Sequence, residues 1–495
     1  MQIQISALKN QANSKNWLVF AAIFMLALVP RLLFVLYEPQ LGGDSYVYIT
    51  VARNIFYHGC VSLSDPASGI CEPHWGGNQL PGYPAFIALT WALFGESELV
   101  PLVAQSVVVA IAIMGVCMVI ASTGFGLRAA GVVAVVLALS PSLVAWPRML
   151  LTETITIGMG LWVFGELLRS IQLGRLTNLR LGIAFAVGLF FRYDFVLFLV
   201  PIVVAALHIH APVAALRRVT IVLIIAAMPV AGWAARCIYV GLPLTPPFGL
   251  TKSGEQLPQG ILAWMGTWIV NQYELPSSVW PLVTGKYTDL HLPDRAVADV
   301  EERARIDMLL MQLKAVHGTS VPDAIDDKFR EIANARRARD PLQQWLFLPL
   351  RRLVTIWSNP FASMGWPAEL DARTRAQASD VLKNPSVENL FALLSEHPTT
   401  VVLKALVTAY RYFVLVMLAA LCGVICFASF SAIRIAVVLA ASFVVVRSIV
   451  FSATILVETR YLAMSLALID VVVALGLWHA WCLMKVRYRM HGRTR

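Results

Sequence analysis

The sequence predicts an all-α polytopic membrane protein: a bundle of about ten transmembrane helices, a helical first outer loop and one larger outer loop domain. Composition is the first reason. Of 495 residues, 58% are hydrophobic and only 14% are charged, and the mean hydropathy is +0.70, whereas soluble domains carry about 25% charged residues. Several apolar runs also reach the roughly 20 residues that a helix needs to cross a bilayer. A transmembrane β-barrel would show alternating hydrophobicity instead.

The formal net charge of +10 indicates an orientation in the membrane and not a nucleic-acid partner. Nucleic-acid binding needs basic residues gathered along a soluble groove or beside an aromatic platform, and the sequence shows no such cluster. The basic residues fall in short loops on one side, as the positive-inside rule expects. We therefore expect both termini in the cytoplasm and a bacterial inner membrane as the location. The marking residues are Arg128, Arg169, Arg175, Arg180, Arg217, Arg218, Arg434 and Lys485.

Residues 1–240 are predicted to form an N-terminal transmembrane catalytic module. Trp17–Tyr37 is its first spanning helix, and because no small-x-small cleavage site follows, it is expected to stay as an anchor. The first outer loop, residues 38–97, is expected to hold a helix that Asp44 caps and a second helix lying at the outer surface. Further spans are expected at residues 100–121, 129–145, 155–168, 181–191, 195–207 and 219–239.

Residues 241–399 are polar, rich in Pro and charge, and lack a spanning run, so they are predicted to form an extracytoplasmic loop domain. Helices are expected over Asp294–Lys314 and Asp323–Arg339, and Trp345–Trp357 suits an interfacial helix. Residues 400–495 are predicted to form the C-terminal transmembrane helices, at residues 400–427, 435–456 and 462–483, followed by a basic cytoplasmic tail.

The alternation of these spans brings ionisable residues from distant parts of the chain to the outer side. Such groups are costly at membrane depth and often functional, so their convergence predicts a site at the outer boundary. The acids are Asp44, Glu153, Asp194 and Glu458, and the arginines are Arg148, Arg192 and Arg460.

Four sequence motifs carry a resemblance to a known family. They are Gly43-Asp44-Ser45-Tyr46 after the first helix, Leu80-Pro81-Gly82-Tyr83-Pro84 leading to Phe94-Gly95, the pair Arg148-Met149-Leu150-Leu151-Thr152-Glu153 and Phe191-Arg192-Tyr193-Asp194, and Glu458-Thr459-Arg460-Tyr461. With these motifs the chain resembles the GT-C superfamily of polyprenyl-phosphate-dependent glycosyltransferases, which includes protein O-mannosyltransferases and the lipid A aminoarabinose transferase. The resemblance covers the first 240 residues well and the last helices more weakly.

The resemblance implies a sugar transfer from a polyprenyl-phosphate donor to a lipid, glycan or protein acceptor on the extracytoplasmic face, with inversion. That chemistry needs a carboxylate that takes the proton of the attacking hydroxyl, and Asp44 is the predicted general base. The leaving lipid phosphate needs cations to hold its charge, and the planar fork of Arg fits phosphate oxygens. Arg192 and Arg460, with Tyr461, are therefore the predicted donor-phosphate residues.

The remaining predicted site residues are Glu153, a second catalytic residue that binds the acceptor or a divalent ion, and four substrate-binding candidates: Tyr46, Arg148, Asp194 and Glu458. Simpler roles stay open at this point. Asp44 is also placed to cap a helix, Glu153 to pair with Arg148, and Asp194 to pair with Arg192. Arginines at helix ends also snorkel to the membrane interface.

The sequence specifies no cofactor, and a divalent metal is possible. His58 and His74 share the first loop with Asp44, but histidines at such irregular spacing are mostly surface residues. The family often has a second acid after the loop aspartate, and here Ser45 stands in that place, which argues against a metal site. Cys60 and Cys71 lie in the same loop, either as a disulfide or as two free thiols.

Two other function classes remain open. A secondary transporter would place polar groups near the bilayer midplane, and Asp470 and Arg447 are the residues that favour it, although both also suit structural pairs or headgroup contacts. A glycan polymerase or ligase would also place arginines outside. The sequence does not specify the sugar or the acceptor.

Overall fold

The computed structural model describes residues 16–37, 39–42, 44–73, 80–242, 257–316, 320–358, 386–427, 431–455 and 457–491. These residues are helical in nearly every ordered element. The β contact among them is one isolated parallel bridge between Gln40 and Met149. The prediction of an all-α membrane protein is confirmed.

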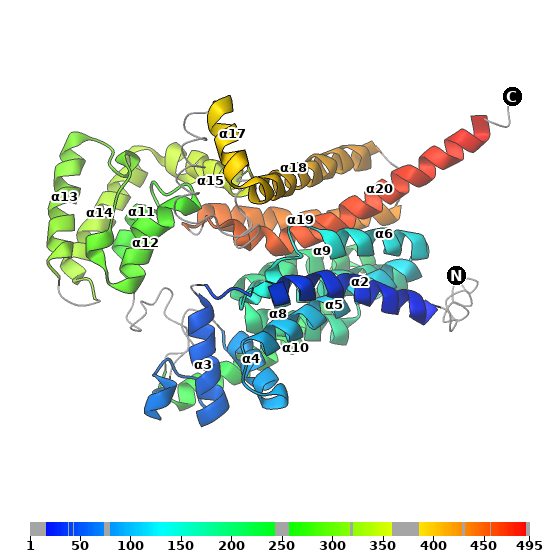
Figure 1. Ribbon diagram of the computed structural model, residues 1–495, viewed down its shortest axis with the longest axis horizontal. Coiled ribbons are helices and arrows are strands. Elements are labelled where there is room, and N and C mark those ends of the chain that lie inside the picture. Colours follow the sequence, from blue (N-terminus) through cyan, green and yellow to red (C-terminus); the bar gives the residue numbers. More distant parts are fainter. Residues whose placement is uncertain are drawn as a thin grey trace.

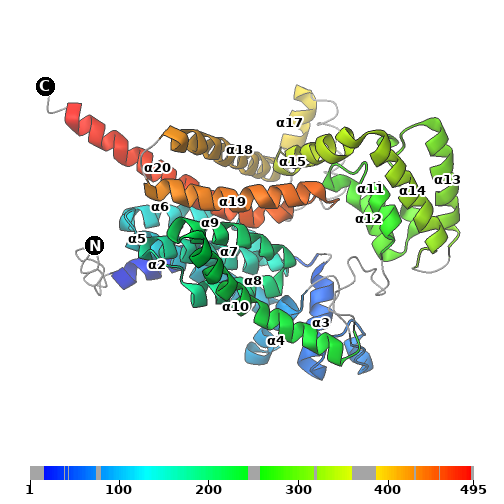
Figure 2. The same ribbon diagram turned by 180° about the vertical axis from the view of Figure 1, so that it is seen from behind.

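The ten predicted spans all form helices, and these lie together in one bundle (Figures 1 and 2). Six are long and apolar enough to cross a membrane: α2 (Asn16–Tyr37), α5 (Leu99–Ser122), α10 (Pro212–Tyr239), α18 (Pro398–Phe427), α19 (Ser431–Ala453) and α20 (Ala463–His491). The other four are α6 (Gly126–Leu139), α7 (Thr152–Leu173), α8 (Asn178–Phe191) and α9 (Leu199–Ile209). Helix α6 ends before the predicted Ala145, because Pro141 follows and cannot continue a helix.

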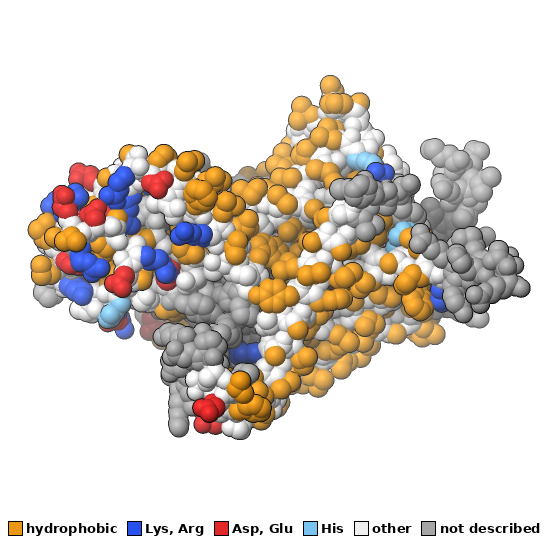
Figure 3. Space-filling view, turned by 90° about the horizontal axis from the view of Figure 1, so that it is seen from above, with side chains coloured by type: hydrophobic (Ala, Val, Ile, Leu, Met, Phe, Trp, Pro, Cys, Tyr) orange, Lys and Arg blue, Asp and Glu red, His pale blue; other side chains and the backbone are white. Residues whose placement is uncertain are grey.

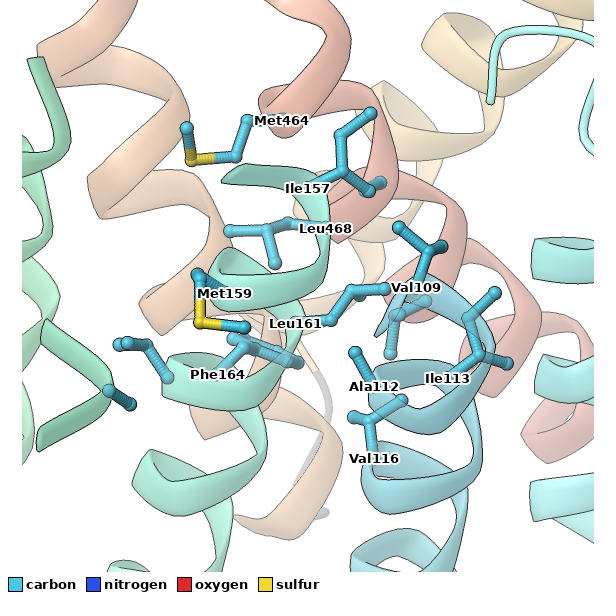
Figure 4. Packing of buried hydrophobic residues seen from close by; sticks show 14 of the residues in the cluster. Val109, Ala112, Ile113, Val116, Ile157, Met159, Leu161, Phe164, Met464 and Leu468 are labelled. Carbon is cyan, nitrogen blue, oxygen red and sulfur yellow. The ribbon is translucent and has the colours of Figure 1, made fainter. Parts of the chain in front are cut away.

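Helix α7 lies at the centre of the bundle, between α5, α8 and α20. Figure 4 shows Leu161 and Phe164 of α7 packed beside Ala112 of α5 and Leu468 of α20. A Cβ atom at Gly160 would lie only 2.9 Å from Cγ of Met464, so the close approach of α7 to α20 depends on this glycine. The packing fixes the axial position of α7, and with it the residues of its first turn.

The first loop forms two helices, α3 (Asp44–His58) and α4 (Gly82–Phe94). A disulfide joins Cys60 to Cys71, with their Cα atoms 6.4 Å apart. A Cβ atom at Gly82 would meet the carbonyl of Phe190, which explains the glycine of the Leu80–Pro84 motif by the close approach of α4 to α8.

The loop region, residues 257–358, forms helices α11 (Gln259–Met265), α12 (Leu275–Thr284), α13 (Val300–Lys314), α14 (Asp323–Arg339) and α15 (Leu348–Ser358), and α17 (Val387–Glu396) follows. Helix α14 has its predicted bounds. Helix α13 starts at Val300 and not at the predicted Asp294, because the carboxylate of Asp299 accepts the backbone N–H of Glu302 at 2.8 Å and caps the helix there. A π-helical turn, Gln343–Phe347, precedes α15.

The bundle has two distinct ends. Helix α2 begins and α20 ends at one of them, whereas the loop region and α3 lie at the other, which we call the loop end (Figure 1). Charged side chains gather on the loop region, and the bundle presents a mostly hydrophobic surface (Figure 3). The core of the loop region includes Trp264 and Phe329 and continues into Phe451 and Tyr461 of the C-terminal segment.

Candidate functional site

Asp44 opens α3 at the loop end and forms an ion pair with Arg460, a residue 416 positions further along the chain. Its Oδ2 lies 2.9 Å from Nη1 of Arg460. Ser45 secures this position, because its hydroxyl donates to the carbonyl of Leu150 at 3.0 Å and accepts the N–H of Gly42 at 3.2 Å. The first residues of α3 are thereby attached to the segment that leads into α7.

Buried Gln105 of α5 holds that same segment from the other side. Its amide donates to the carbonyls of Pro147 and Met149 at 2.7 and 2.8 Å, and its Oε1 accepts the hydroxyl of Tyr83 at 2.8 Å. These bonds set where α7 begins, and therefore where Glu153 lies in its first turn. A carboxylate there is also favoured by the positive end of the helix dipole.

Glu153 lies between two arginines. Its Oε1 accepts Nη1 of Arg192 at 2.9 Å and lies 4.0 Å from Nε of Arg460. Arg192 also binds Asp194 through two bonds, Nε to Oδ1 at 3.0 Å and Nη2 to Oδ2 at 3.2 Å. The simpler expectation that Asp194 pairs with Arg192 is thus met in the structure.

Arg460 is surrounded by carboxylates. In addition to Asp44 and Glu153, Oε2 of Glu458 lies 2.5 Å from its Nε. Its Nη2 donates to the hydroxyl of Tyr461 at 3.3 Å. One guanidinium therefore connects α3, α7 and the turn before α20, so the three segments meet at this residue.

Tyr461 presents its ring to the two predicted phosphate arginines. The guanidinium carbons of Arg192 and Arg460 each lie 5.2 Å from the ring centroid. Phe451 stacks on the same ring with centroids 4.6 Å apart and an interplanar angle of 8°. The aromatic contacts limit how far either guanidinium can move from the ring.

Arg447 of α19 also contacts these charged side chains, although the sequence analysis assigned it to structural pairs or headgroup contacts. Its Nη2 donates to Oδ2 of Asp194 at 2.7 Å, and its Nε donates to the carbonyl of Tyr461 at 2.7 Å. An arginine inside a hydrophobic span signals a function, but the sequence does not indicate which helix face it lies on.

The site cluster consists of four carboxylates and three guanidiniums: Asp44, Glu153, Asp194, Glu458, Arg192, Arg447 and Arg460. Burial, with the nearby charges of Asp44 and Glu153, raises the pKa of Glu458 despite its pairing with Arg460. With a proton on Glu458, the cluster would be neutral. The side chain of Asp44 is 36% exposed and that of Arg447 only 2%, so Asp44 lies toward water and Arg447 deepest.

The two other predicted substrate-binding residues differ in burial. Tyr46 is 61% exposed on α3, and Arg148 is fully buried, with its carbonyl accepting the N–H of Gln40 at 2.9 Å. Tyr48 of α3 is buried instead, and burial and the charges of Asp44 and Glu153 raise its pKa. Its position four residues after Asp44, on the same helix face, is the signal that would have found it.

Among the described residues, no three His, Cys, Asp or Glu side chains are grouped to hold a metal ion. Nε2 of His58 lies 2.9 Å from the carbonyl oxygen of Pro66, and His74 lies outside the described residues. Asp470, which favoured a transporter, is buried in α20 and accepts the hydroxyl of Tyr410 at 3.0 Å. Its supposed companion, Arg447, belongs to the site cluster instead.

Comparison with known proteins gives two matches among solved structures, and both are structures of ArnT. The crystal structures of ArnT from Cupriavidus metallidurans bound to undecaprenyl phosphate and in the apo state match with TM-scores of 0.39 and 0.38, at 14% sequence identity, over 93% of this chain and 78% of theirs. No protein-family model and no curated protein matches the chain. A structural likeness of this size does not by itself assign a function.

Proposed function

We propose that this protein is an integral membrane glycosyltransferase that moves a sugar from a polyprenyl-phosphate donor to an acceptor on the extracytoplasmic face, with inversion at the anomeric carbon. The observation that carries the proposal is the meeting of Asp44, Glu153, Arg192 and Arg460 around Tyr461 at the loop end. These residues belong to the motifs that resemble the GT-C superfamily, and they supply both a carboxylate base and cations for a phosphate.

Asp44 is the general base. As the acceptor hydroxyl attacks the anomeric carbon, the carboxylate takes its proton. The new carbon–oxygen bond forms while the bond from the anomeric carbon to the phosphate oxygen breaks. Asp44 suits this role because it has the most exposed side chain of the carboxylates paired in the cluster, at 36%, so an acceptor can approach it from water.

Arg192 and Arg460 stabilise the leaving phosphate. The phosphate departs with the electron pair of the broken bond, and the two guanidiniums beside the Tyr461 hydroxyl hold its charge. In the structure Nη1 of Arg460 is engaged with Asp44. A bound phosphate competes for this guanidinium, so donor binding frees the carboxylate of Asp44 to act on the acceptor.

Glu153 positions both phosphate arginines, since one of its oxygens faces Arg192 at 2.9 Å and Arg460 at 4.0 Å. The loop end, which carries the site, faces the extracytoplasmic side in this proposal. The basic turns at the opposite end, among them Arg128 and Arg218, then face the cytoplasm in accordance with the positive-inside rule. The loop region beside the site selects the acceptor.

The test is a transfer assay in proteoliposomes with a purified polyprenyl-phosphate sugar and a membrane extract as acceptor. Asp44→Asn keeps the size of the side chain and removes its basicity, so turnover is expected to fall by about 10²- to 10⁴-fold, the usual contribution of a general base. Mass spectrometry of glycolipids from cells with and without the gene identifies the sugar and the acceptor for the assay.

Asp65→Asn is the matched control, because Asp65 lies in the same loop and, within the described part of the chain, its carboxylate accepts a local backbone N–H, that of Ala67 at 3.0 Å. Asparagine can make the same bond, so turnover should be unchanged. Near-normal turnover in a well-folded Asp44→Asn protein would refute the assignment of the base.

A further inference from the structure

We propose that Arg447 is a third phosphate-binding residue, which donates to the lipid phosphate from the deepest part of the site. The inference rests on the proposed function, because it assumes that the anion in this site is the phosphate of the carrier. It adds a residue from α19 to a site that the sequence motifs assign to Arg192, Arg460 and Tyr461.

Arg447 is fully desolvated and only partly satisfied. Its side chain is 2% exposed. Nε and Nη2 donate to the Tyr461 carbonyl and to Asp194, whereas Nη1 is buried without a hydrogen-bond partner in the part of the chain that the structure describes. A buried cationic N–H group that makes no bond is costly, and a phosphate oxygen is the acceptor that would best offset the cost.

The surroundings hold this guanidinium ready for a ligand. The ring centroids of Phe443 and Phe451, one helical turn before and after Arg447, lie 5.6 and 4.9 Å from its guanidinium carbon. Phe451 in turn stacks on the ring of Tyr461. Donors fixed in this way lose little freedom when an anion binds, which is what makes preorganised sites effective for stabilising negative charge.

Arg447 also shares a partner with a predicted phosphate residue. Oδ2 of Asp194 accepts both Nη2 of Arg192 at 3.2 Å and Nη2 of Arg447 at 2.7 Å. The two guanidiniums are therefore neighbours held together by one carboxylate. An anion between Arg192 and Arg447 would relieve the repulsion between their charges. A purely structural salt bridge would need only one arginine for one carboxylate.

The experiment measures binding of undecaprenyl phosphate to the full-length protein in phosphatidylcholine nanodiscs, with undecaprenol as the neutral comparison. Arg447→Gln should weaken binding of undecaprenyl phosphate by about 10- to 100-fold, as expected for loss of one charge-assisted hydrogen bond, and leave undecaprenol binding unchanged. Arg447→Lys keeps the charge without the planar fork, so an intermediate loss is expected, and it serves if the glutamine variant does not fold.

Arg31→Gln is the matched control. Arg31 is also fully buried in the bundle, and its Nε has no hydrogen-bond partner among the described residues, but its bonds go to the backbone carbonyls of Ala27 and Leu137 at 2.7 and 2.9 Å. Its replacement should lower the melting temperature without changing the preference for undecaprenyl phosphate over undecaprenol.

The outcomes separate the two proposals. If the wild type binds undecaprenyl phosphate but not undecaprenol, and both Arg447 variants bind equally well, the proposed role of Arg447 is wrong. The proposed function is not affected by that result. Equal binding of phosphatidic acid would overturn the assignment of the site to the carrier. Phosphate-dependent binding that Arg447→Gln abolishes, in a protein that transfers no sugar, would support the inference and count against the transferase.

Discussion

Two arginines of this protein, the buried Arg336 in the loop region and the partly buried Arg460 at the site, differ in how their charges are compensated. Arg336 faces a single carboxylate, that of Glu302, and its Nε donates to Oε1 and Oε2 of Glu302 at 3.0 and 3.2 Å. The other two nitrogens of Arg336 donate to the hydroxyl of Thr267 and to the carbonyl of Ala296. All these partners lie in the loop region. Arg460 faces three carboxylates that come from three separate segments.

The difference shows why burial of an ion pair is weak support for function. The pair of Arg336 and Glu302 holds α14 to α13, and its remaining donors and acceptors are satisfied by neighbours within the loop region, among them Thr267 and Arg339. The site cluster has more carboxylates than guanidiniums, and Arg192 and Arg460 each face carboxylates from more than one segment. The convergence of several segments on one guanidinium, and not its burial, is the feature that marks a site.

The largest expected effect separates stability from activity. Arg336→Met leaves the buried carboxylate of Glu302 with only a more distant cation, Nη2 of the exposed Arg339 at 3.8 Å, so the free energy of unfolding should fall by at most about 3–5 kcal/mol. Turnover per folded molecule in the transfer assay should stay near that of the wild type, because Arg336 lies outside the site cluster. Thermal unfolding in detergent and the transfer assay measure the two quantities.

The double variant Arg336→Met with Glu302→Leu is the control, since removing both charges should recover most of the lost stability. If Arg336→Met instead lowered turnover per folded molecule as strongly as Asp44→Asn, the distinction between a structural pair of Arg336 and Glu302 and a functional site cluster would be wrong.

The next prediction is a loss of turnover with little loss of stability. Arg460→Lys keeps a positive charge among the three carboxylates but loses the planar fork that matches phosphate oxygens. Turnover is expected to fall about 10²-fold, the usual effect of removing one donor to a developing negative charge, with little change in melting temperature. Arg351→Lys on the exposed face of α15 is a suitable control. A large loss of stability with normal turnover would show that Arg460, like Arg336, is structural.

The smallest effect concerns Glu458, whose pKa is raised in the folded protein by burial and by Asp44 and Glu153. A raised carboxyl pKa means that the charged form is less favourable in the folded than in the unfolded state. As the pH falls from 7 to 5, the wild type should therefore gain stability relative to Glu458→Gln, which cannot titrate. The melting temperatures of both proteins at the two pH values give the comparison, and a difference that is constant or moves the other way would contradict it.

The helices of the bundle followed from hydropathy because each apolar run had to be shielded from water. Helix α14 was predicted with its bounds, since charged and apolar residues alternate with helical spacing from Asp323 to Arg339. Counting membrane crossings also placed Asp44, Glu153, Arg192 and Arg460 on one side. Alternation restricts where a residue can lie to one of two sides, which is enough to group distant residues.

Side-chain partners could not be predicted in the same way, because they depend on the rotation of each helix about its own axis. Arg447 was therefore missing from the predicted site, and Tyr46 was preferred to Tyr48. The substrate-binding roles of Tyr46 and Arg148 remain predictions. The start of α13 was misplaced because the capping bond of Asp299 outweighed the earlier acid, Asp294.

The disulfide between Cys60 and Cys71 ties the maturation of this protein to its surroundings. Such bonds form and persist mainly in oxidising compartments, so in the proposed orientation the first loop would acquire its crosslink outside the cytoplasm. In that orientation, the redox balance outside the membrane would act on the loop that carries Asp44 before any substrate is present.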